Sequence, residues 1–299
     1  MDTIHLVAIL AFLIGFFLKK HKKCPSNLYH LVNQFIIFFC LPSISLLKIP
    51  SLEFNGQMIH LVITAWLIFF GGIPFFYLFS KIFNWSKETL VCLIVVCGLG
   101  NTAFFGLPII AALFGEKALT YAVFIDQPGS FLIISTIGTA LCIIASSGKI
   151  SIPQILFKLL TFPPFIAFLF AVFIPIHPSG FLKEIMLFLI KIIGPLALFS
   201  LGLQFSINLK ETEWLPLSFG LFYRLLLGPF LVMLYLKLFY GKTDLINTIG
   251  IMENAMAPMM TAAIITGKYN LNPKLGNNLV TIGVPISFIT LCIWKLILT

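Results

Sequence analysis

Residues 98–108 place polar side chains beside helix-breaking residues within an otherwise apolar run. The segment reads GLGNTAFFGLP and contains Asn101, Thr102 and Pro108. Proline lacks a backbone N–H and disfavours helix at the residue before it, and glycine loosens the same turn. The side chains of Asn101 and Thr102 are therefore predicted to bind backbone groups that the break sets free, or a small ligand.

Residues 252–258, which read MENAMAP, show the same combination late in the chain, with Glu253 and Asn254 ahead of Pro258. Two such breaks that meet would present helix N-termini, which attract anions, and helix C-termini, which attract cations. An ionisable group in so apolar a run usually faces a cavity or a partner. Glu253 is predicted either to bind a sodium ion or a proton, or to lie near a membrane interface where water reaches it.

Three further polar side chains lie in apolar surroundings. Asp126 and Gln127 immediately precede Pro128, and Asp126 is predicted either to join a site with Glu253 or to cap a helix. Arg224 can hold a carboxylate through a two-pronged hydrogen bond. The alternative for Arg224 is an internal ion pair with Glu253 or Asp126.

The composition assigns these groups to a membrane protein. Of 299 residues, 60% are hydrophobic and only 10% are charged, and the mean hydropathy is +1.07. Soluble domains carry about 25% charged residues. The net charge of +9 does not indicate a nucleic acid partner, because the lysines are scattered in short segments and Arg224 is the only arginine. The lipid bilayer is the predicted partner instead.

A helix needs about 20 apolar residues to cross a bilayer, and ten runs are candidates. The predicted fold is an all-α integral membrane protein with ten transmembrane helices, of which the fourth and ninth contain the two breaks. The predicted spans are residues 3–18, 29–47, 57–80, 89–113, 119–145, 155–175, 182–205, 214–240, 244–267 and 275–297.

The lysines predict an orientation. The loops after the odd-numbered spans hold eleven lysines, whereas the opposite side holds six. Because cytoplasmic loops are richer in lysine and arginine, the odd-numbered loops are predicted to be cytoplasmic and both termini to lie outside. The first apolar run precedes its charges and lacks a cleavage motif, so it is predicted to be a span and not a signal peptide.

Prolines inside the spans recur in the same order in the two halves of the chain, at offsets of 153, 155, 150 and 157 residues. The corresponding pairs are Pro42 with Pro195, Pro74 with Pro229, Pro108 with Pro258, and Pro128 with Pro285. The spacing predicts a five-helix repeat used twice, over residues 1–148 and 149–299, with the second copy inverted because five is odd. Inverted repeats with interrupted helices at matching positions indicate a secondary transporter. One break alone would favour a simple proline kink, whereas two at matching positions, each beside an asparagine, favour a site.

Residues 100–108, GNTAFFGLP, resemble the GNTGFLGLP-type segment of the auxin efflux carrier family, whose bacterial members are described as malate or auxin-like permeases. Residues 255–262 are similar to the AMPP-like stretch of that family, with Ala257 in place of the first proline. Residues 33–42 resemble its N-F-x-x-x-x-x-L-P pattern, with Gln34 inserted. With the number of spans, the resemblance covers nearly the whole chain.

The resemblance implies two inverted five-helix repeats, related to the fold of bile-acid sodium symporters, with spans 4 and 9 crossing at their prolines. It implies a scaffold of spans 1, 2, 6 and 7, and a transport domain of spans 3–5 and 8–10 that moves like an elevator. It also implies a homodimer through the scaffold. The long central loop of plant members is missing, since only residues 146–154 take its place.

The predicted function is that of a permease or efflux carrier for a small organic anion, such as an auxin-like compound or a dicarboxylate, in a bacterial-type inner membrane. The alternative is a sodium-coupled symporter of an organic anion, similar to the bile-acid symporters. Ion coupling, to Na+ or H+ and without another cofactor, is assigned to Glu253, Asp126 and Gln127. Substrate binding is assigned to Asn101, Thr102, Pro108, Asn254, Pro258 and Arg224.

Other classes of protein find no support in the sequence. The chain contains no HExxH or GxSxG motif and no paired intramembrane aspartates, so an enzyme is not predicted. A pore-lining ring motif and a voltage-sensing row of arginines are also missing. Five of the six cysteines lie in apolar stretches, where cysteine acts as a small hydrophobe, and neither a disulfide nor a metal site is predicted.

Overall fold

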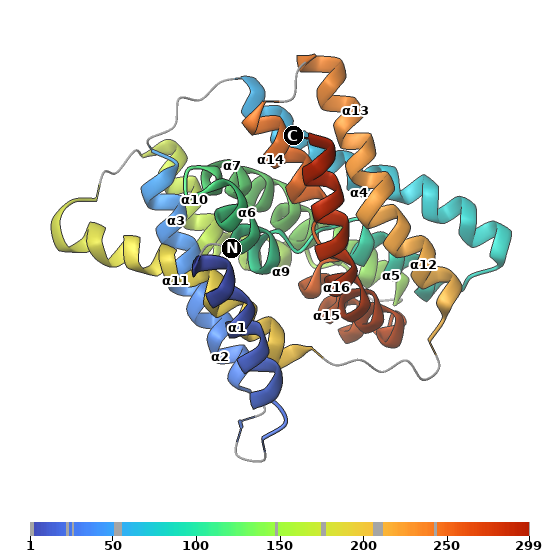
Figure 1. Cartoon of the computed structure of the whole chain (residues 1–299). Coiled ribbons are helices and arrows are strands. Elements are labelled where there is room, and N and C mark those ends of the chain that lie inside the picture. The colour runs from blue at the N-terminus through green and yellow to red at the C-terminus, as the bar shows by residue number, and fades with distance from the viewer. Residues whose placement is uncertain are drawn as a thin grey trace. The chain divides into compact units, whose positions relative to one another are not determined.

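A computed structural model describes residues 3–21, 24–25, 27–50, 56–146, 149–174, 178–205, 212–241 and 244–298. All regular elements in these ranges are helices (Figure 1). Lys22, Lys23, Lys210 and Lys242, which contribute to the predicted orientation, lie outside the described residues.

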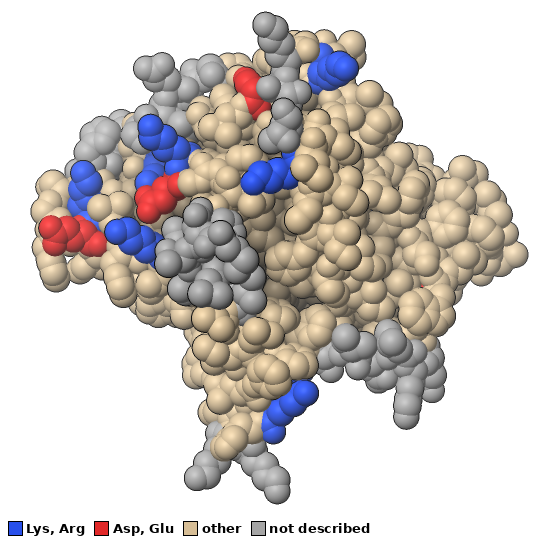
Figure 2. All heavy atoms as spheres, viewed as in Figure 1, with Lys and Arg blue, Asp and Glu red and all other residues tan. Residues whose placement is uncertain are grey.

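Six helical stretches in the described part of the chain are long and apolar enough to cross a membrane. They are Leu28–Lys48, Gly56–Phe83, Ala118–Ala145, Gly180–Gln204, Trp214–Tyr240 and Pro273–Leu298. These stretches correspond to the predicted spans 2, 3, 5, 7, 8 and 10. Many of their large apolar side chains are exposed, and most of the face drawn in Figure 2 carries neither acidic nor basic side chains. Such a surface requires lipid as its solvent, so the chain is an integral membrane protein.

Three of these stretches are continuous α-helices from end to end, although each contains an internal proline. The helices are α4 (Gly56–Phe83), α11 (Gly180–Gln204) and α16 (Pro273–Leu298), with Pro74, Pro195 and Pro285 inside them. The remaining long stretches consist of two α-helices joined through wider turns. They are α2 (Leu28–Phe35) with α3 (Leu41–Lys48), α7 (Ala118–Ile125) with α8 (Thr139–Ala145), and α12 (Trp214–Phe222) with α13 (Gly228–Tyr240).

The wider turns are π-helical, and most of them adjoin a proline. A proline cannot donate to the carbonyl four residues back and its ring clashes with that carbonyl, and a π turn relieves both problems. The turns next to Pro42, Pro108, Pro128 and Pro229 cover Ile36–Cys40, Thr102–Gly106, Asp126–Phe131 and Tyr223–Leu227.

The other predicted spans are short or divided. The first is α1 (Thr3–Leu18), and the sixth is divided into α9 (Ile152–Leu160) and α10 (Pro163–Phe173). The fourth and ninth are interrupted, as their glycines and prolines predict. The structure therefore confirms an all-helical membrane protein, while the count of ten spans and the inverted repeat stay predictions.

Contacts between residues divide the chain into two compact units. Unit 1 consists of residues Met1–Phe54, Ala103–Val123 and Leu160–Ser206. Within it, α1 packs closely along α11. Glycine at positions 15 and 202 permits this approach, because a Cβ added at Gly15 or at Gly202 would overlap the backbone of the facing helix. Small residues that let two backbones approach are typical of helix packing in membranes. The same unit contains α2, α3, α6 (Leu107–Phe114) and α10.

Unit 2 consists of residues Asn55–Thr102, Phe124–Leu159 and Ile207–Thr299. Its long helix α4 contacts α5 (Lys87–Cys97), α13 and α14 (Leu245–Asn254), and α16 contacts α5, α12 and α15 (Met260–Lys268). The tail of α5 and the tail of α14 are buried by these neighbours. Unit 2 therefore holds the ends of two interrupted helices in its interior.

Candidate substrate site at two helix breaks

The first break follows α5. The Ser86 hydroxyl caps the start of this helix by accepting a hydrogen bond from the Thr89 N–H at 3.2 Å, and the helix ends at Cys97, before Gly98 and Gly100. Helical structure resumes at Thr102. Pro108 lies further along, buried in the first turn of α6, where a proline is tolerated because that N–H has no helical partner.

The second break contacts the first. The helix α14 ends at Asn254 and α15 begins at Met260. Gly100 and Pro258 form an antiparallel bridge, and the Asn101 N–H donates to the Ala257 carbonyl at 2.9 Å. The expected crossing of the two broken helices therefore exists within unit 2. It lies at Gly100 and Pro258, however, so the prediction that Pro108 takes part in the crossing is wrong.

The guanidinium of Arg224 donates hydrogen bonds to backbone carbonyls at the end of α14. Its Nη2 donates to the Asn254 carbonyl at 2.7 Å and its Nε to the Met256 carbonyl at 3.0 Å. The expected ion pair with Glu253 or Asp126 is not formed, because the guanidinium binds carbonyls that the broken helix leaves without amide donors. Within the described ranges, the ion pair present is between Lys48 and Glu116.

Asp126 is linked to the first break. The Thr102 hydroxyl donates to Asp126 Oδ1 at 2.5 Å, and Gln127 Nε2 donates to Oδ2 at 2.6 Å. All three side chains are buried. Asp126 lies within a helical stretch, in a π turn, and not at its start, so the alternative of a helix-capping carboxylate is wrong.

Asn254 connects the second break to α4. Its Nδ2 donates to the Thr64 hydroxyl at 2.7 Å and to the Gly250 carbonyl at 2.9 Å. Thr64 was not among the residues predicted from the sequence. The only feature of the sequence that could have indicated Thr64 is a hydroxyl group in an apolar run. Such a hydroxyl usually bonds a carbonyl of its own helix, and Thr64 does donate to the Leu61 carbonyl at 2.6 Å.

Four buried side-chain atoms near the breaks have no hydrogen-bond partner among the described residues. They are Asn101 Nδ2, Gln127 Oε1, and both carboxyl oxygens of Glu253. Glu253 is 0% exposed, which excludes the alternative that it lies in water at the membrane interface. A buried polar group without a partner costs about 1–3 kcal/mol, so such atoms commonly mark a functional site.

Of the predicted site residues, Asn101, Thr102, Asp126, Gln127, Arg224, Glu253, Asn254 and Pro258 all belong to unit 2. Their roles in binding stay predictions. In the part of the chain that the structure describes, no cluster of three His, Cys, Asp or Glu side chains could hold a metal ion.

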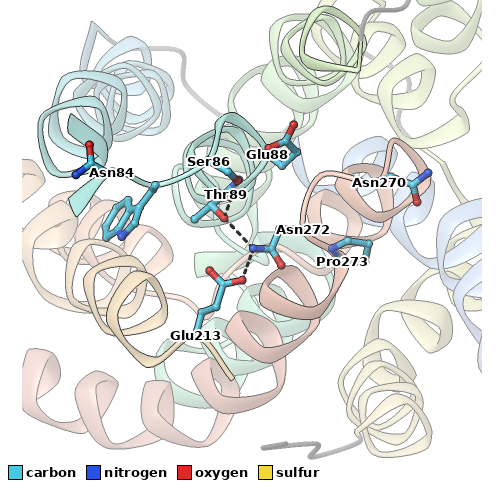
Figure 3. Close-up of a pocket in the computed structure, with 9 residues that line it drawn as sticks. Asn84, Ser86, Glu88, Thr89, Glu213, Asn270, Asn272 and Pro273 are labelled. Atoms are coloured by element: carbon cyan, nitrogen blue, oxygen red, sulfur yellow. Dashed lines mark hydrogen bonds between the residues drawn. The ribbon is translucent and has the colours of Figure 1, made fainter. Parts of the chain in front are cut away.

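A polar hollow of about 520 Å³ lies elsewhere on unit 2 (Figure 3). At its centre, Asn272 Nδ2 donates to Thr89 Oγ1 and to Glu213 Oε1, both at 2.8 Å. Asn272 Oδ1 accepts from the Leu275 N–H at 3.2 Å and so caps α16. Because all the polar atoms of Asn272 have partners, we interpret this hollow as a junction of helix ends and not as a binding site.

Apolar helices with buried polar groups at two contacting breaks are the features of a membrane transport protein. The sequence model of the family described as "Membrane transport protein" (Mem_trans) matches residues 4–295, and the chain belongs to this family, which is the auxin efflux carrier family. The resemblance drawn from residues 100–108 is thereby confirmed. The family consists of transporters and not enzymes.

Two curated archaeal proteins are similar along almost their full length. A protein of Methanocaldococcus jannaschii, named an uncharacterised transporter, is 28% identical, covering 100% of this chain and 98% of that protein. A second uncharacterised transporter, from Methanothermobacter thermautotrophicus, is 24% identical, covering 99% of this chain and 98% of that protein.

Proposed function

We propose that the protein is a secondary active carrier of a small organic anion, such as an auxin-like compound or a dicarboxylate. The observation that carries this proposal is the amide of Asn101. Its Nδ2 is a buried donor that has no partner among the described residues, and its backbone N–H donates to the Ala257 carbonyl. A fixed donor that protein groups leave free suits the carboxylate of a substrate.

The helix ends around Asn101 also favour an anion. The π turn that begins at Thr102 and the helix α15 that begins at Met260 both start just after the breaks. The N-terminus of a helix carries a partial positive charge and free N–H groups, which stabilise anions. Thr102, Asn254 and Pro258 are the proposed neighbouring contacts. Pro108 belongs to unit 1, and its role in substrate binding stays a prediction from the sequence.

Glu253 is the proposed coupling group. Its two carboxyl oxygens are buried and accept no hydrogen bond within the described part of the chain, and a carboxylate in that condition is costly unless a cation or a proton accompanies it. Asp126 and Gln127 are proposed to act with it, since Gln127 Oε1 is also unpartnered. These acceptors support the second candidate, a sodium-coupled symporter of an organic anion.

Alternating access is proposed to follow the elevator scheme that the family resemblance implies. Unit 1 contains residues of spans 1, 2, 6 and 7, which supports their grouping as a scaffold, together with residues 103–123 of spans 4 and 5, which the scaffold prediction does not include. The excess of lysines after odd-numbered spans supports a cytoplasmic location for those loops and external termini. We also propose that the protein forms a homodimer and lies in a bacterial-type inner membrane.

Reconstitution tests the proposed function. Purified protein would be screened by thermal stabilisation, and by uptake into liposomes, against a panel of organic anions with and without sodium and pH gradients. A saturable response to one carboxylate class is expected. Asn101→Ala should weaken the apparent affinity roughly 10–100-fold, because a hydrogen bond to a charged group contributes about 1.5–3 kcal/mol.

A matched control is Asn278→Ala. Asn278 is also buried, but its Nδ2 already has a partner in the Thr212 hydroxyl at 3.1 Å, so the change should lower stability and leave the affinity for the anion unchanged. The proposal fails if no anion stabilises the folded protein, or if Asn101→Ala transports with wild-type affinity.

A further inference from the structure

The carbonyl end of α14 is where a carrier of this kind would hold a cation. A helix C-terminus carries a partial negative charge and carbonyls without helical partners. In transporters with broken helices, unwound carbonyls at such ends coordinate monovalent cations near the middle of the membrane. At the end of α14, these carbonyls belong to Asn254 and Met256.

Arg224 already occupies this position. Both carbonyls accept hydrogen bonds from its guanidinium, at 2.7 and 3.0 Å, and the side chain is 1% exposed. The residue lies in the π turn Tyr223–Leu227, which is fixed on one side by the Tyr223 hydroxyl donating to the Ile68 carbonyl. The guanidinium is therefore a permanent positive charge at a fixed place.

Gly100, in the first break, leaves space for the Arg224 guanidinium. A Cβ added at Gly100 would overlap Arg224 Nη2 and lie 3.0 Å from Cζ, so any larger residue there would displace the guanidinium. The corresponding end of α5 is satisfied differently. Its Val96 and Leu99 carbonyls accept from the Met259 N–H at 3.2 and 3.1 Å. Neither helix end leaves these carbonyls free for a metal ion.

We propose that Arg224 is a built-in substitute for a bound alkali-metal ion, so that the carrier takes no such ion at the end of α14. The structural part of this inference stands on the contacts of Arg224 alone, whereas its meaning for ion coupling rests on the proposed function. The bound guanidinium limits where sodium could bind in the sodium-coupled alternative, because the Asn254 and Met256 carbonyls would not be available as ligands. Arg224 is then a positioning residue that determines ion specificity.

The test is thermal unfolding of detergent-purified protein in sodium, lithium, potassium or guanidinium chloride, compared with choline chloride at equal ionic strength. Sodium should raise the unfolding temperature of the wild type less than that of Arg224→Ala, because Arg224 already occupies the α14 carbonyls. Arg224→Ala should unfold at a lower temperature in choline. Sodium or dilute guanidinium, at ten times its dissociation constant, should then raise that temperature by about 2–4 °C.

Lys237→Ala is the matched control, because it removes an exposed positive charge from the same membrane-spanning stretch without touching the α14 carbonyls. It should show no cation-specific response. Where Arg224→Ala yields no folded protein, Gly100→Ala replaces it, since the added methyl group displaces the guanidinium, and the same cation response is expected.

Two results overturn the inference. One is a stabilisation of the wild type by sodium that is as large as that of Arg224→Ala, and the other is a folded Arg224→Ala or Gly100→Ala variant that responds to no cation. No organic anion enters this experiment. A failure to transport anions would therefore count against the proposed function and leave the assignment of Arg224 intact.

Discussion

The carboxyl groups of Asp126 and Glu253, both buried in unit 2, differ in their hydrogen bonding. Both oxygens of Asp126 accept hydrogen bonds from neighbouring side chains, whereas neither oxygen of Glu253 has a partner among the described residues. A group that is already satisfied has little reason to exchange a ligand during a transport cycle. Glu253 is therefore the better candidate for the residue that binds and releases an ion.

Glu253→Gln should separate coupling from transport. A neutral amide can neither carry a proton nor balance a cation, so an imposed sodium or pH gradient should no longer drive accumulation of the anion. Exchange of the anion down its own gradient should continue. Uptake into proteoliposomes with and without each gradient measures both quantities, and gradient-driven accumulation at the wild-type level would refute the role of Glu253.

Asp126→Asn provides the contrast. The amide nitrogen would face donors from Thr102 and Gln127, and one buried group would lose its partner, at a cost of about 1–3 kcal/mol. We expect this variant to lose thermal stability in a melting experiment, regardless of which ion is present. Unchanged stability would show that the hydrogen bonds around Asp126 contribute little.

The helix α16 supports the crossing through close contact. A Cβ at Gly283 would lie 2.6 Å from Pro258 Cδ, whereas a Cβ at Gly276, on the same helix, would meet nothing nearer than 3.4 Å. Gly283→Ala should therefore cost about 1–3 kcal/mol through overpacking and should impair transport. Gly276→Ala should be neutral or slightly stabilising, because alanine favours helix. Melting temperatures of the pair test this, and equal values would contradict it.

The sequence predicted the long spans because continuous apolar runs require helix in lipid, where every backbone group must be bonded internally. It also predicted both breaks, since glycine and proline weaken helices locally. It placed the crossing wrongly at Pro108, because a proline is equally at home in the first turn of a new helix. Which backbone segments pair depends on contacts between distant residues, and composition does not reveal them.

Arg224 shows the same limit. Its burial within an apolar run was predicted, and an acidic partner was the natural expectation for a buried charge. The actual partners are backbone carbonyls, which are present at every residue and become available only where a helix stops. Thr64 was not predicted for a related reason, because its importance comes from a hydrogen bond that it accepts from the distant Asn254 side chain.

The orientation of the whole protein in the membrane can be tested with cysteine labelling. Cys24 follows the first span and is partly exposed, and the lysine distribution predicts that it lies on the cytoplasmic side. Lys117 lies in the loop after the fourth span, on the predicted outer side. In a background without the other cysteines, an impermeant maleimide should label Lys117→Cys in right-side-out vesicles and Cys24 only in inverted vesicles. The reverse pattern would overturn the predicted topology.

The π turn at Tyr223–Leu227 makes this span sensitive to length. A π turn closes its hydrogen bonds one residue later than an α turn, so it behaves like an α-helix that has accepted one additional residue. Deleting a residue there would restore a regular helix and rotate everything on one side by about 100°. Arg224 or Pro229 would then leave its present face. In this apolar span, evolution can therefore substitute residues far more freely than it can delete them.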